Sequence, residues 1–301
     1  MPSVYAYKDK NISRTWAMFL IFFGVVVGGG WIFSQIYQDP GILVIAVIFA
    51  LFMNVLSFWF SDKIVLAMHK AKPVTRENGR ELYNIVENLA ITAGLPTPKI
   101  YIVEERQLNA FATGRDPKHA VVAVTTGLLE KLDRTELEGV IAHELSHIGN
   151  RDMLVGTVAV VLVGFIAILS DIFLRSLWYG GGKRDNDRNG GGGIIILIGI
   201  AFAILAPIFL RLMRLAISRK RESLADISGA LLTRYPEGLA SALEKIATDT
   251  TPMKIANNTT AHLWIDDPFN KLGDEKTPWL HRIFMTHPPV RDRIKALRDM
   301  S

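Results

Sequence analysis

Four uncharged apolar blocks constrain this chain of 301 residues more than any other feature of its sequence. They cover residues 15–38, 40–61, 153–170 and 190–210. Each of the first two exceeds the roughly 20 residues that a helix needs to cross about 30 Å of hydrocarbon. Only Asp39 separates these two blocks, so they form a hairpin. We therefore expect a membrane-anchored protein whose remaining segments form a soluble part.

The third and fourth apolar blocks allow two interpretations. The block 153–170 has only the minimum length for a span, so this pair could instead be a hairpin buried in a protein core. The segment 180–193 between the two blocks is rich in glycine and charge, which is typical of a solvated loop. The sequence therefore predicts two to four transmembrane helices.

Lysine and arginine residues near the blocks predict the orientation. They precede the first block, follow the second and follow the fourth. Cytoplasmic flanks of spans carry an excess of these residues, so we expect the soluble part to face the cytoplasm. Lys183, Arg184 and Arg188 would then lie on the opposite side, which is a weak exception. The lack of a eukaryotic targeting segment favours a bacterial inner membrane.

The composition excludes several kinds of function. The chain has no cysteine, so it has no disulfide, no thiol nucleophile and no cysteine-ligated zinc. Its net charge is +5, and the basic residues cluster beside the apolar blocks, where anionic lipid head groups attract them. We therefore expect the lipid bilayer as a partner and no nucleic acid. Any metal must be held by histidine and carboxylate side chains. The oligomeric state stays open.

The soluble part is expected to combine two hydrophilic stretches. Because a hairpin returns its two ends to one side, both stretches emerge together and can build one domain. The chain then divides into an N-terminal transmembrane hairpin (1–61), a first part of the soluble domain (62–152), a second apolar hairpin (153–210) and a second part of the soluble domain (211–301).

The residue pattern predicts a mixture of helices and strands in this domain. Apolar residues recur at helical spacing over 76–93, and a second helix over 135–150 begins with a capping box formed by Thr135 and Glu138. A closing amphipathic helix is expected over 288–301, with Arg293 on its solvated side. Short segments rich in β-formers predict strands at 99–104, 108–113 and 120–125.

The helix predicted over 135–150 contains the sequence His143-Glu144-Leu145-Ser146-His147. Residues four apart lie on one face of a helix, so both imidazoles can reach one Zn²⁺ ion. Glu144 can then act as general base toward water at that ion. Apolar residues on both sides of the motif favour a buried ligand helix over a solvated helix face. The motif predicts a catalytic zinc site that hydrolyses peptide bonds.

Two histidines leave a catalytic zinc ion one protein ligand short. Glu222 offers the third ligand, and Asp226 follows it one turn later on the same helix face. Asp226 is then placed to accept a hydrogen bond from a ligand histidine and to fix its tautomer. Acids four residues apart are common on exposed helices, so this assignment depends on the His-Glu-x-x-His motif that precedes it.

With these residues, the chain resembles the M48 family of zinc metalloendopeptidases over essentially its whole length. The resemblance rests on the spans, the motif helix, the Glu222 and Asp226 helix and the stretch His287-Pro288-Pro289-Val290-Arg291. It implies that His143, His147 and Glu222 hold one Zn²⁺ ion and that Glu144 is the general base. The implied fold is α+β, a mostly helical zincin-like metalloprotease domain with a small β-sheet, anchored by two to four transmembrane helices.

The resemblance gives two further segments a role. Asn109, Ala110 and Phe111 resemble an edge strand that binds an extended substrate, because an edge strand has free N–H and C=O groups. A plain core strand is the alternative. His287 resembles a family histidine that could hydrogen-bond the developing oxyanion or the substrate backbone, with a simple loop histidine as the alternative. No catalytic role is expected for the remaining histidines, His69, His119, His262 and His281.

The predicted function is zinc-dependent endoproteolysis of membrane or misfolded proteins. The resemblance implies a role in membrane-protein quality control under stress. Two alternatives are a processing peptidase for prenylated C-terminal motifs, which has more spans in that branch, and a non-catalytic zinc-binding membrane scaffold. Glu144 discriminates against the scaffold, because a structural zinc site does not need this residue.

Overall fold

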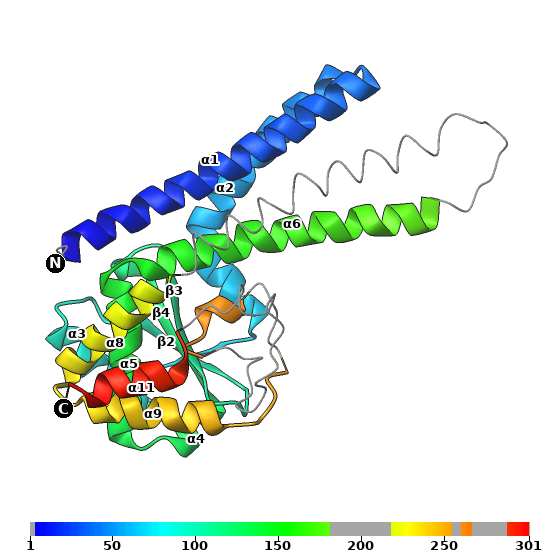
Figure 1. The fold of residues 1–301 in the computed structure, drawn as a ribbon. Helices are drawn as coiled ribbons and strands as arrows, with labels where there is room; N and C mark the ends of the chain where they lie inside the picture. Colours follow the sequence, from blue (N-terminus) through cyan, green and yellow to red (C-terminus); the bar gives the residue numbers. More distant parts are fainter. Residues whose placement is uncertain (1–3, 181–217, 255–259, 267–287, 301) are drawn as a thin grey trace.

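The computed structural model describes residues 4–180, 218–254, 260–266 and 288–300 (Figure 1). The apolar block 190–210, most of the glycine-rich segment and His287 lie outside the described residues. The fourfold division of the chain and the number of spans beyond two therefore stay predictions.

Two long helices, α1 (Val4–Tyr37) and α2 (Pro40–Met68), form the predicted N-terminal hairpin. Asp39 caps α2, because its side chain accepts a hydrogen bond from the Gly41 N–H at 2.8 Å. Both helices are long and apolar enough to cross a membrane, over Asp9–Gln35 and over the whole of α2. In Figure 1 the hairpin projects away from the rest of the fold.

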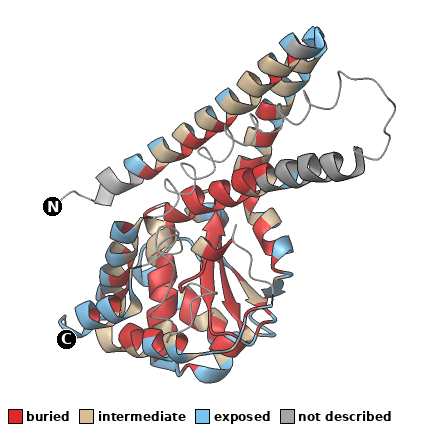
Figure 2. Ribbon diagram, turned by 45° about the vertical axis from the view of Figure 1, so that its right-hand side comes forward, coloured by how far each residue is buried: buried red, intermediate tan, exposed pale blue. Residues whose placement is uncertain are grey.

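Large apolar side chains remain exposed along this hairpin, whereas buried residues concentrate in the domain below it (Figure 2). Leu20 and Ile45 each keep 69% of their surface exposed. A surface of this kind is unfavourable in water and favourable in hydrocarbon. The exposed residues of the hairpin therefore support its role as a membrane anchor.

A four-stranded mixed sheet with the strand order β1-β2-β4-β3 forms the centre of the domain. The parallel pair β2 and β4 lies in the middle, and both outer strands are antiparallel to their neighbours. The three predicted strands are confirmed to within two residues, and the three-residue β1 was not predicted. The strands are β1 (Lys72–Val74), β2 (Lys99–Val103), β3 (Ala110–Gly114) and β4 (Ala120–Thr125).

Both faces of the sheet are covered. On one face Val122 and Val124 pack in the core with α3 (Arg80–Thr92) and α5 (Arg134–Gly149). On the other face Val121 and Ala123 pack with the end of α2 and with Trp264. Successive residues of a strand point to opposite faces of the sheet. Because both faces are buried here, the central strand β4 is apolar except at its last residue and does not alternate with polar residues. Three short helices join these elements: Pro117–His119, α4 (Thr126–Lys131) and Ala261–Leu263.

The N-cap of α5, the helix that carries the His-Glu-x-x-His motif, lies two residues before the predicted N-cap. Its capping box is formed by Asp133 and Glu136, so the prediction of Thr135 and Glu138 is wrong. The Asp133 side chain accepts from the Glu136 N–H at 3.0 Å, and Glu136 accepts from the Asp133 N–H at 2.8 Å. The residue pairs Asp133/Glu136 and Thr135/Glu138 both have the spacing of a capping box, but only Asp133/Glu136 forms the two hydrogen bonds.

A sharp turn joins α5 to α6 (Asp152–Gly180), which contains the third apolar block. The two helix axes differ by 81°. Arg151 in this turn adopts a left-handed backbone conformation with φ of 58°, which is uncommon for a residue other than glycine. The turn places the start of α6 beside α1, with which it forms a second apolar core.

Two later helices, α8 and α9, pack against α5, and α11 packs against α8 and α9 (Figure 1). The approach of α8 to α5 is close at Gly229, where a Cβ atom would lie 2.9 Å from the backbone nitrogen of His143. The helices α5 and α8 carry the predicted ligands, so this glycine sets the distance between the two ligand-bearing backbones. The three helices are α8 (Arg219–Thr233), α9 (Pro236–Thr248) and α11 (Val290–Arg298).

Candidate metal centre

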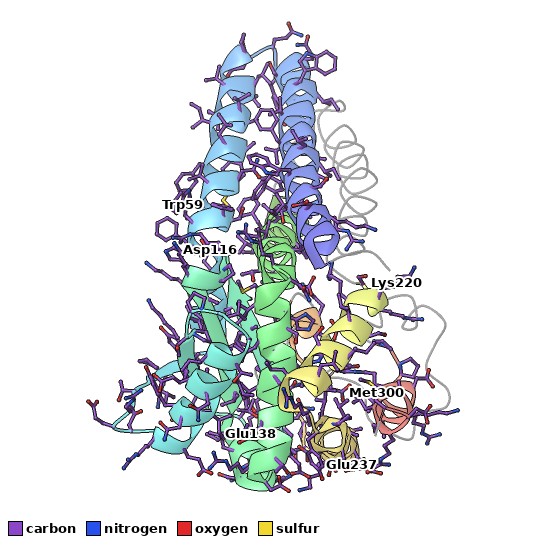
Figure 3. The ribbon with its side chains drawn as sticks, turned by 90° about the vertical axis from the view of Figure 1, so that its left-hand side faces the viewer. Trp59, Asp116, Glu138, Lys220, Glu237 and Met300 are labelled. Atoms are coloured by element: carbon purple, nitrogen blue, oxygen red, sulfur yellow. The ribbon has the colours of Figure 1, made fainter. Side chains whose placement is uncertain are left out.

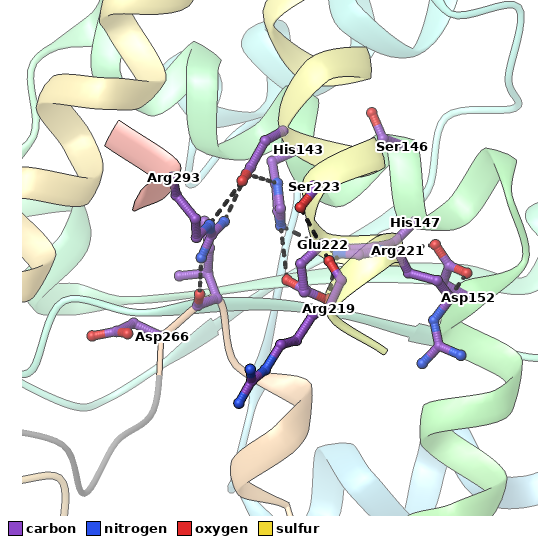
Figure 4. Close-up of polar contacts among 12 residues, drawn as sticks. His143, Ser146, His147, Asp152, Arg219, Arg221, Glu222, Ser223, Asp266 and Arg293 are labelled. Atoms are coloured by element: carbon purple, nitrogen blue, oxygen red, sulfur yellow. Dashed lines mark hydrogen bonds and ion pairs between the residues drawn. The ribbon is translucent and has the colours of Figure 1, made fainter. Parts of the chain in front are cut away.

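The side chains of His143, His147 and Glu222 converge between α5 and α8 (Figure 4). One ligand atom from each residue lies within 4.8 Å of the other two. The two Nε2 atoms are 3.2 Å apart, and each lies 3.7 Å from an oxygen of Glu222. Two nitrogens bound to one tetrahedral ion at 2.0–2.1 Å lie about 3.3 Å apart. The donor atoms and their spacing therefore fit a metal ion of this size.

Both histidines contact a carboxylate through the nitrogen on the far side of the ring. His143 Nδ1 lies 2.9 Å from Asp226 Oδ1, at the place predicted from the sequence. His147 Nδ1 lies 3.0 Å from Asp152 Oδ2, a partner that the sequence did not predict. A carboxylate beside Nδ1 keeps the proton of the neutral imidazole on Nδ1. The lone pair of Nε2 is then available to bind a metal ion. The surroundings thus prepare both Nε2 atoms for a metal.

The two histidines differ in their pKa values. Burial lowers the pKa of His143, and the neighbouring Asp226 offsets only part of this effect. Burial opposes the charge of His147 as well, but Glu222 and Asp152 outweigh it and raise the pKa of His147 to about 9. Without a metal, His147 therefore holds its proton more tightly than His143 does. A metal ion has to displace the proton of His147 when it binds.

Arg293 of α11 extends the site to the C-terminal helix (Figure 4). Its guanidinium donates to both oxygens of Asp226, at 2.7 and 2.9 Å, and to the carbonyl of Ile265 at 2.9 Å. Only 3% of Arg293 is exposed, so the prediction that it lies on a solvated helix side is wrong. Burial would raise the pKa of Asp226, but Arg293 and His143 hold it well below its usual range. Asp226 therefore stays ionised beside His143.

A second polar network joins the site to the membrane hairpin. The Asn11 side chain of α1 donates to Asp152 Oδ1 at 2.6 Å and to the Asn150 carbonyl at 3.0 Å. Arg221 of α8 lies 3.3 Å from the same Asp152 oxygen. Asp152 thus contacts a ligand histidine, a membrane helix and the ligand-bearing helix α8. No local sequence signal connects Asn11 with Asp152, because they are far apart in the chain.

A small cavity of about 40 Å³ opens beside the three converging side chains. Glu144 lines this cavity and is 2% exposed, so it adjoins the position at which a metal would bind. The opposite wall comes from the segment 260–266, including His262 and Trp264, for which the sequence predicted no role in the site. Trp264 is buried against Phe111, with ring centroids 4.8 Å apart.

The strand β3 lies at the edge of the sheet, as predicted, and part of that edge is already covered. The Ile265 N–H donates to the Ala110 carbonyl at 2.9 Å, and the Asn109 side chain donates to the Asp266 carbonyl at 3.1 Å. The backbone N–H and C=O groups of every second strand residue face the same side. Because those of Ala110 face away from β4, those of Ala112 do so too. Among the described residues no backbone group bonds to Ala112 on this side, and Ala112 lines the cavity.

A His-Glu-x-x-His helix on a mixed sheet, with a third donor on a later helix, defines the zincin-like metalloproteases. The fold agrees with this class. It is similar to the crystal structure of S. mikatae Ste24p with a TM-score of 0.51 and 19% sequence identity. The similarity covers 95% of this chain and 67% of that chain.

The sequence comparisons define the family. The model of Peptidase family M48 matches residues 76–301. A protein named Protease HtpX homolog from Thermoanaerobacter pseudethanolicus is 46% identical over 304 residues, covering 99% of this chain and 98% of that protein. A protein of the same name from Pyrococcus furiosus is 47% identical over 290 residues, covering 96% and 95%.

The chain therefore belongs to peptidase family M48. It is a membrane-anchored metalloprotease, and these findings do not favour the processing peptidase or the inert scaffold. Membership of a metalloprotease family implies a metal ion, for which His143, His147 and Glu222 form a suitable donor group. Its substrates are polypeptides, and its anchor lies in a lipid bilayer.

Proposed function

We propose that the metal is one Zn²⁺ ion per chain, held by His143, His147 and Glu222, and that Glu144 is the general base. The observation that carries this proposal is the convergence of two imidazole nitrogens and one carboxylate oxygen. Each of the two histidines also contacts a further carboxylate through its Nδ1 atom. This donor set matches that of catalytic zinc sites, which keep one position open for water or substrate. Asp226 acts as a positioning residue for His143.

The chain's own residues divide the chemistry between them. When bound, zinc supplies the Lewis acidity that acidifies water and polarises the scissile carbonyl. Glu144 takes the proton of the attacking water on its carboxylate and delivers it to the leaving amine. The wall formed by Trp264 and its neighbours limits the water around Glu144, which strengthens electrostatic interactions there.

The edge of β3 supports a binding mode for an extended polypeptide. We propose that a substrate pairs with the outward groups of Ala112, next to the cavity. Asn109 and Ala110 hold the segment 265–266 beside that edge, and Phe111 supports it through Trp264. The role of His287 toward the oxyanion stays a prediction from the sequence. Membrane or misfolded proteins are the proposed substrates, in quality control under stress.

Removal of the metal is the direct test of the zinc proposal. A chelator is expected to abolish casein cleavage by the full-length protein in detergent, and added Zn²⁺ should restore it. Elemental analysis should find about one zinc per chain in the wild type. Glu222→Ala should weaken zinc binding by more than about 100-fold, because even outer partners of ligands contribute 10–100-fold.

The neighbouring Ser223 provides the matched control on α8. Its side chain is exposed and, within the described part of the chain, donates only to the Arg219 carbonyl, so Ser223→Ala should keep its zinc and its activity. Undiminished cleavage by the fully chelated protein would overturn the zinc proposal. Full zinc content in Glu222→Ala would overturn the assignment of the third ligand.

We propose that the protein crosses a bacterial inner membrane more than once and that the protease domain is cytoplasmic. The basic flanks of the apolar blocks support this orientation. The cysteine-free chain allows a simple test with single cysteines at exposed positions. In intact cells a membrane-impermeant maleimide should label Gln35→Cys, near the tip of the hairpin, and spare Asp299→Cys until the cells are opened. The reverse labelling pattern would contradict the orientation.

A further inference from the structure

A second and larger cavity lies where the membrane hairpin meets the domain. It is a cleft of about 580 Å³ that shares no lining residue with the cavity at the metal centre. This volume lies within the roughly 300–1,000 Å³ that is typical of small-molecule sites. Most of its wall is apolar and comes from the two membrane helices: Trp16 and Phe19 of α1, and Leu51, Val55, Phe58 and Trp59 of α2.

One end of the cleft is positively charged. Arg115 and Asp116, which follow β3, line it together with Arg151 from the turn between α5 and α6. Arg115 lies 3.5 Å from Asp116, whose other oxygen contacts His119 at 2.8 Å, so the charged lining consists of two guanidinium groups and one carboxylate. Among the described residues Arg151 forms no ion pair. The end of the cleft therefore has an excess positive charge suited to an anion.

The apolar and the charged ends lie at the level expected of a membrane interface. Trp16 and Trp59 remain more than half exposed, and tryptophan is enriched where spans leave the hydrocarbon. The Arg115 guanidinium lies 4.6 Å from the centre of the Trp59 ring. Figure 3 shows Trp59 and Asp116 close together at the base of the hairpin, where the domain begins. With the interface at these tryptophans, the apolar wall would border hydrocarbon and the charged residues would border head groups.

We propose that this cleft binds one anionic glycerophospholipid of the surrounding bilayer. Its phosphate contacts Arg115 and Arg151, and an acyl chain lies against Phe19, Leu51 and Val55. Arginine recognises phosphate through charge-assisted hydrogen bonds in a planar fork, and the apolar wall removes the chain from contact with water. A zwitterionic lipid offers the same chains with a weaker net attraction to the two arginines.

The two arginines belong to the elements that build the metal centre. Arg115 follows the strand β3 that lines the metal cavity, and Arg151 precedes Asp152, which contacts His147. The left-handed backbone of Arg151 directs the turn at a cost in local strain, which is commonly retained at functional positions. A phosphate held by both residues would fix the end of β3 relative to the α5–α6 turn.

Lipid retention by the purified full-length protein tests this proposal without any measurement of proteolysis. The protein is placed in nanodiscs of mixed phosphatidylglycerol and phosphatidylcholine, extracted into detergent and weighed by native mass spectrometry. The wild type should retain one phosphatidylglycerol and prefer it over phosphatidylcholine. The double variant Arg115→Gln, Arg151→Gln should retain it at least about tenfold more weakly, because it loses two charge-assisted contacts.

Two further variants separate the cleft from general attraction to the membrane surface. The double variant Lys10→Gln, Lys63→Gln removes the same charge from exposed positions at the ends of the two spans and should retain lipid as the wild type does. Val55→Trp keeps both arginines and fills the apolar wall, so it should lose the lipid. If the arginine double variant does not fold, Val55→Trp alone still tests the proposal.

Three results would overturn the proposal. The first is equal retention of phosphatidylglycerol by the wild type and either cleft variant. The second is an equal loss in the lysine double variant, which would mean that any basic flank attracts the lipid. The third is equal retention of phosphatidylcholine and phosphatidylglycerol by the wild type, which would remove the role of the arginines.

Discussion

Glu144→Gln is expected to reduce peptide hydrolysis by about 10²–10⁴-fold while zinc remains bound. Glutamine has nearly the same shape as glutamate but cannot accept the proton of the attacking water, and general acid–base catalysis typically contributes 10²–10⁴-fold. Glu144 is buried beside the cavity and is not one of the three converging donors, so its replacement leaves the donor set intact. Casein cleavage and zinc content are measured on the same preparations.

Glu138→Gln is the matched control for this experiment. Glu138 lies on the same helix, and its partner is Arg134, 3.0 Å away on the surface. Its replacement should leave cleavage and zinc content unchanged, because exposed pairs of this kind contribute little. Wild-type cleavage by Glu144→Gln with zinc bound would contradict the assignment of the general base. Loss of zinc in Glu144→Gln would instead place this residue among the ligands.

Arg293→Met is expected to destabilise the domain by about 3–5 kcal/mol, the range observed when one partner of a buried ion pair is removed. The methionine leaves the Asp226 carboxylate buried without its main cation. It also frees the Ile265 carbonyl, so the wall of the metal cavity loses its link to α11. Because Asp226 orients His143, zinc affinity should fall by about 10–100-fold as well.

Thermal unfolding in detergent and a zinc titration measure these two effects. Arg298→Met on the same helix is the control, because Arg298 is exposed and pairs with Glu237 and Glu244 on the surface. The control should unfold close to the wild-type temperature and bind zinc normally. If both variants behaved alike, the buried contact between Arg293 and Asp226 would not support the site.

The sequence was sufficient to predict the parts of the site that depend on local periodicity. His143 and His147 share a helix face because they are four residues apart, and the same spacing relates Glu222 to Asp226. The strands were predictable because β-branched or aromatic residues occur in short segments bounded by turns. The three residues Lys72–Val74 are too few to carry such a pattern, and they form a strand only because β2 lies beside them.

The partners of the ligands could not be predicted, because they depend on contacts between distant parts of the chain. Arg293 has the sequence context of a surface residue, and only the packing of α11 against Asp226 explains its burial. Asp152 follows the motif helix closely, yet its contact with His147 requires the sharp turn before α6. The segment 260–266 has no periodic pattern, and its position depends on bonds to Asn109 and Ala110.

The contacts of Asp152 have a consequence for any attempt to obtain a soluble catalytic fragment. Asn11, Asp152 and His147 form a continuous hydrogen-bonded series from the first membrane helix to the ring that faces the metal position. Excision of residues 1–61 would remove Asn11 and leave the buried Asp152 carboxylate with fewer donors. Zinc affinity measured on such a fragment would then describe an altered ligand environment. The structural unit that supports the metal site therefore includes the start of the first membrane helix as well as the protease domain.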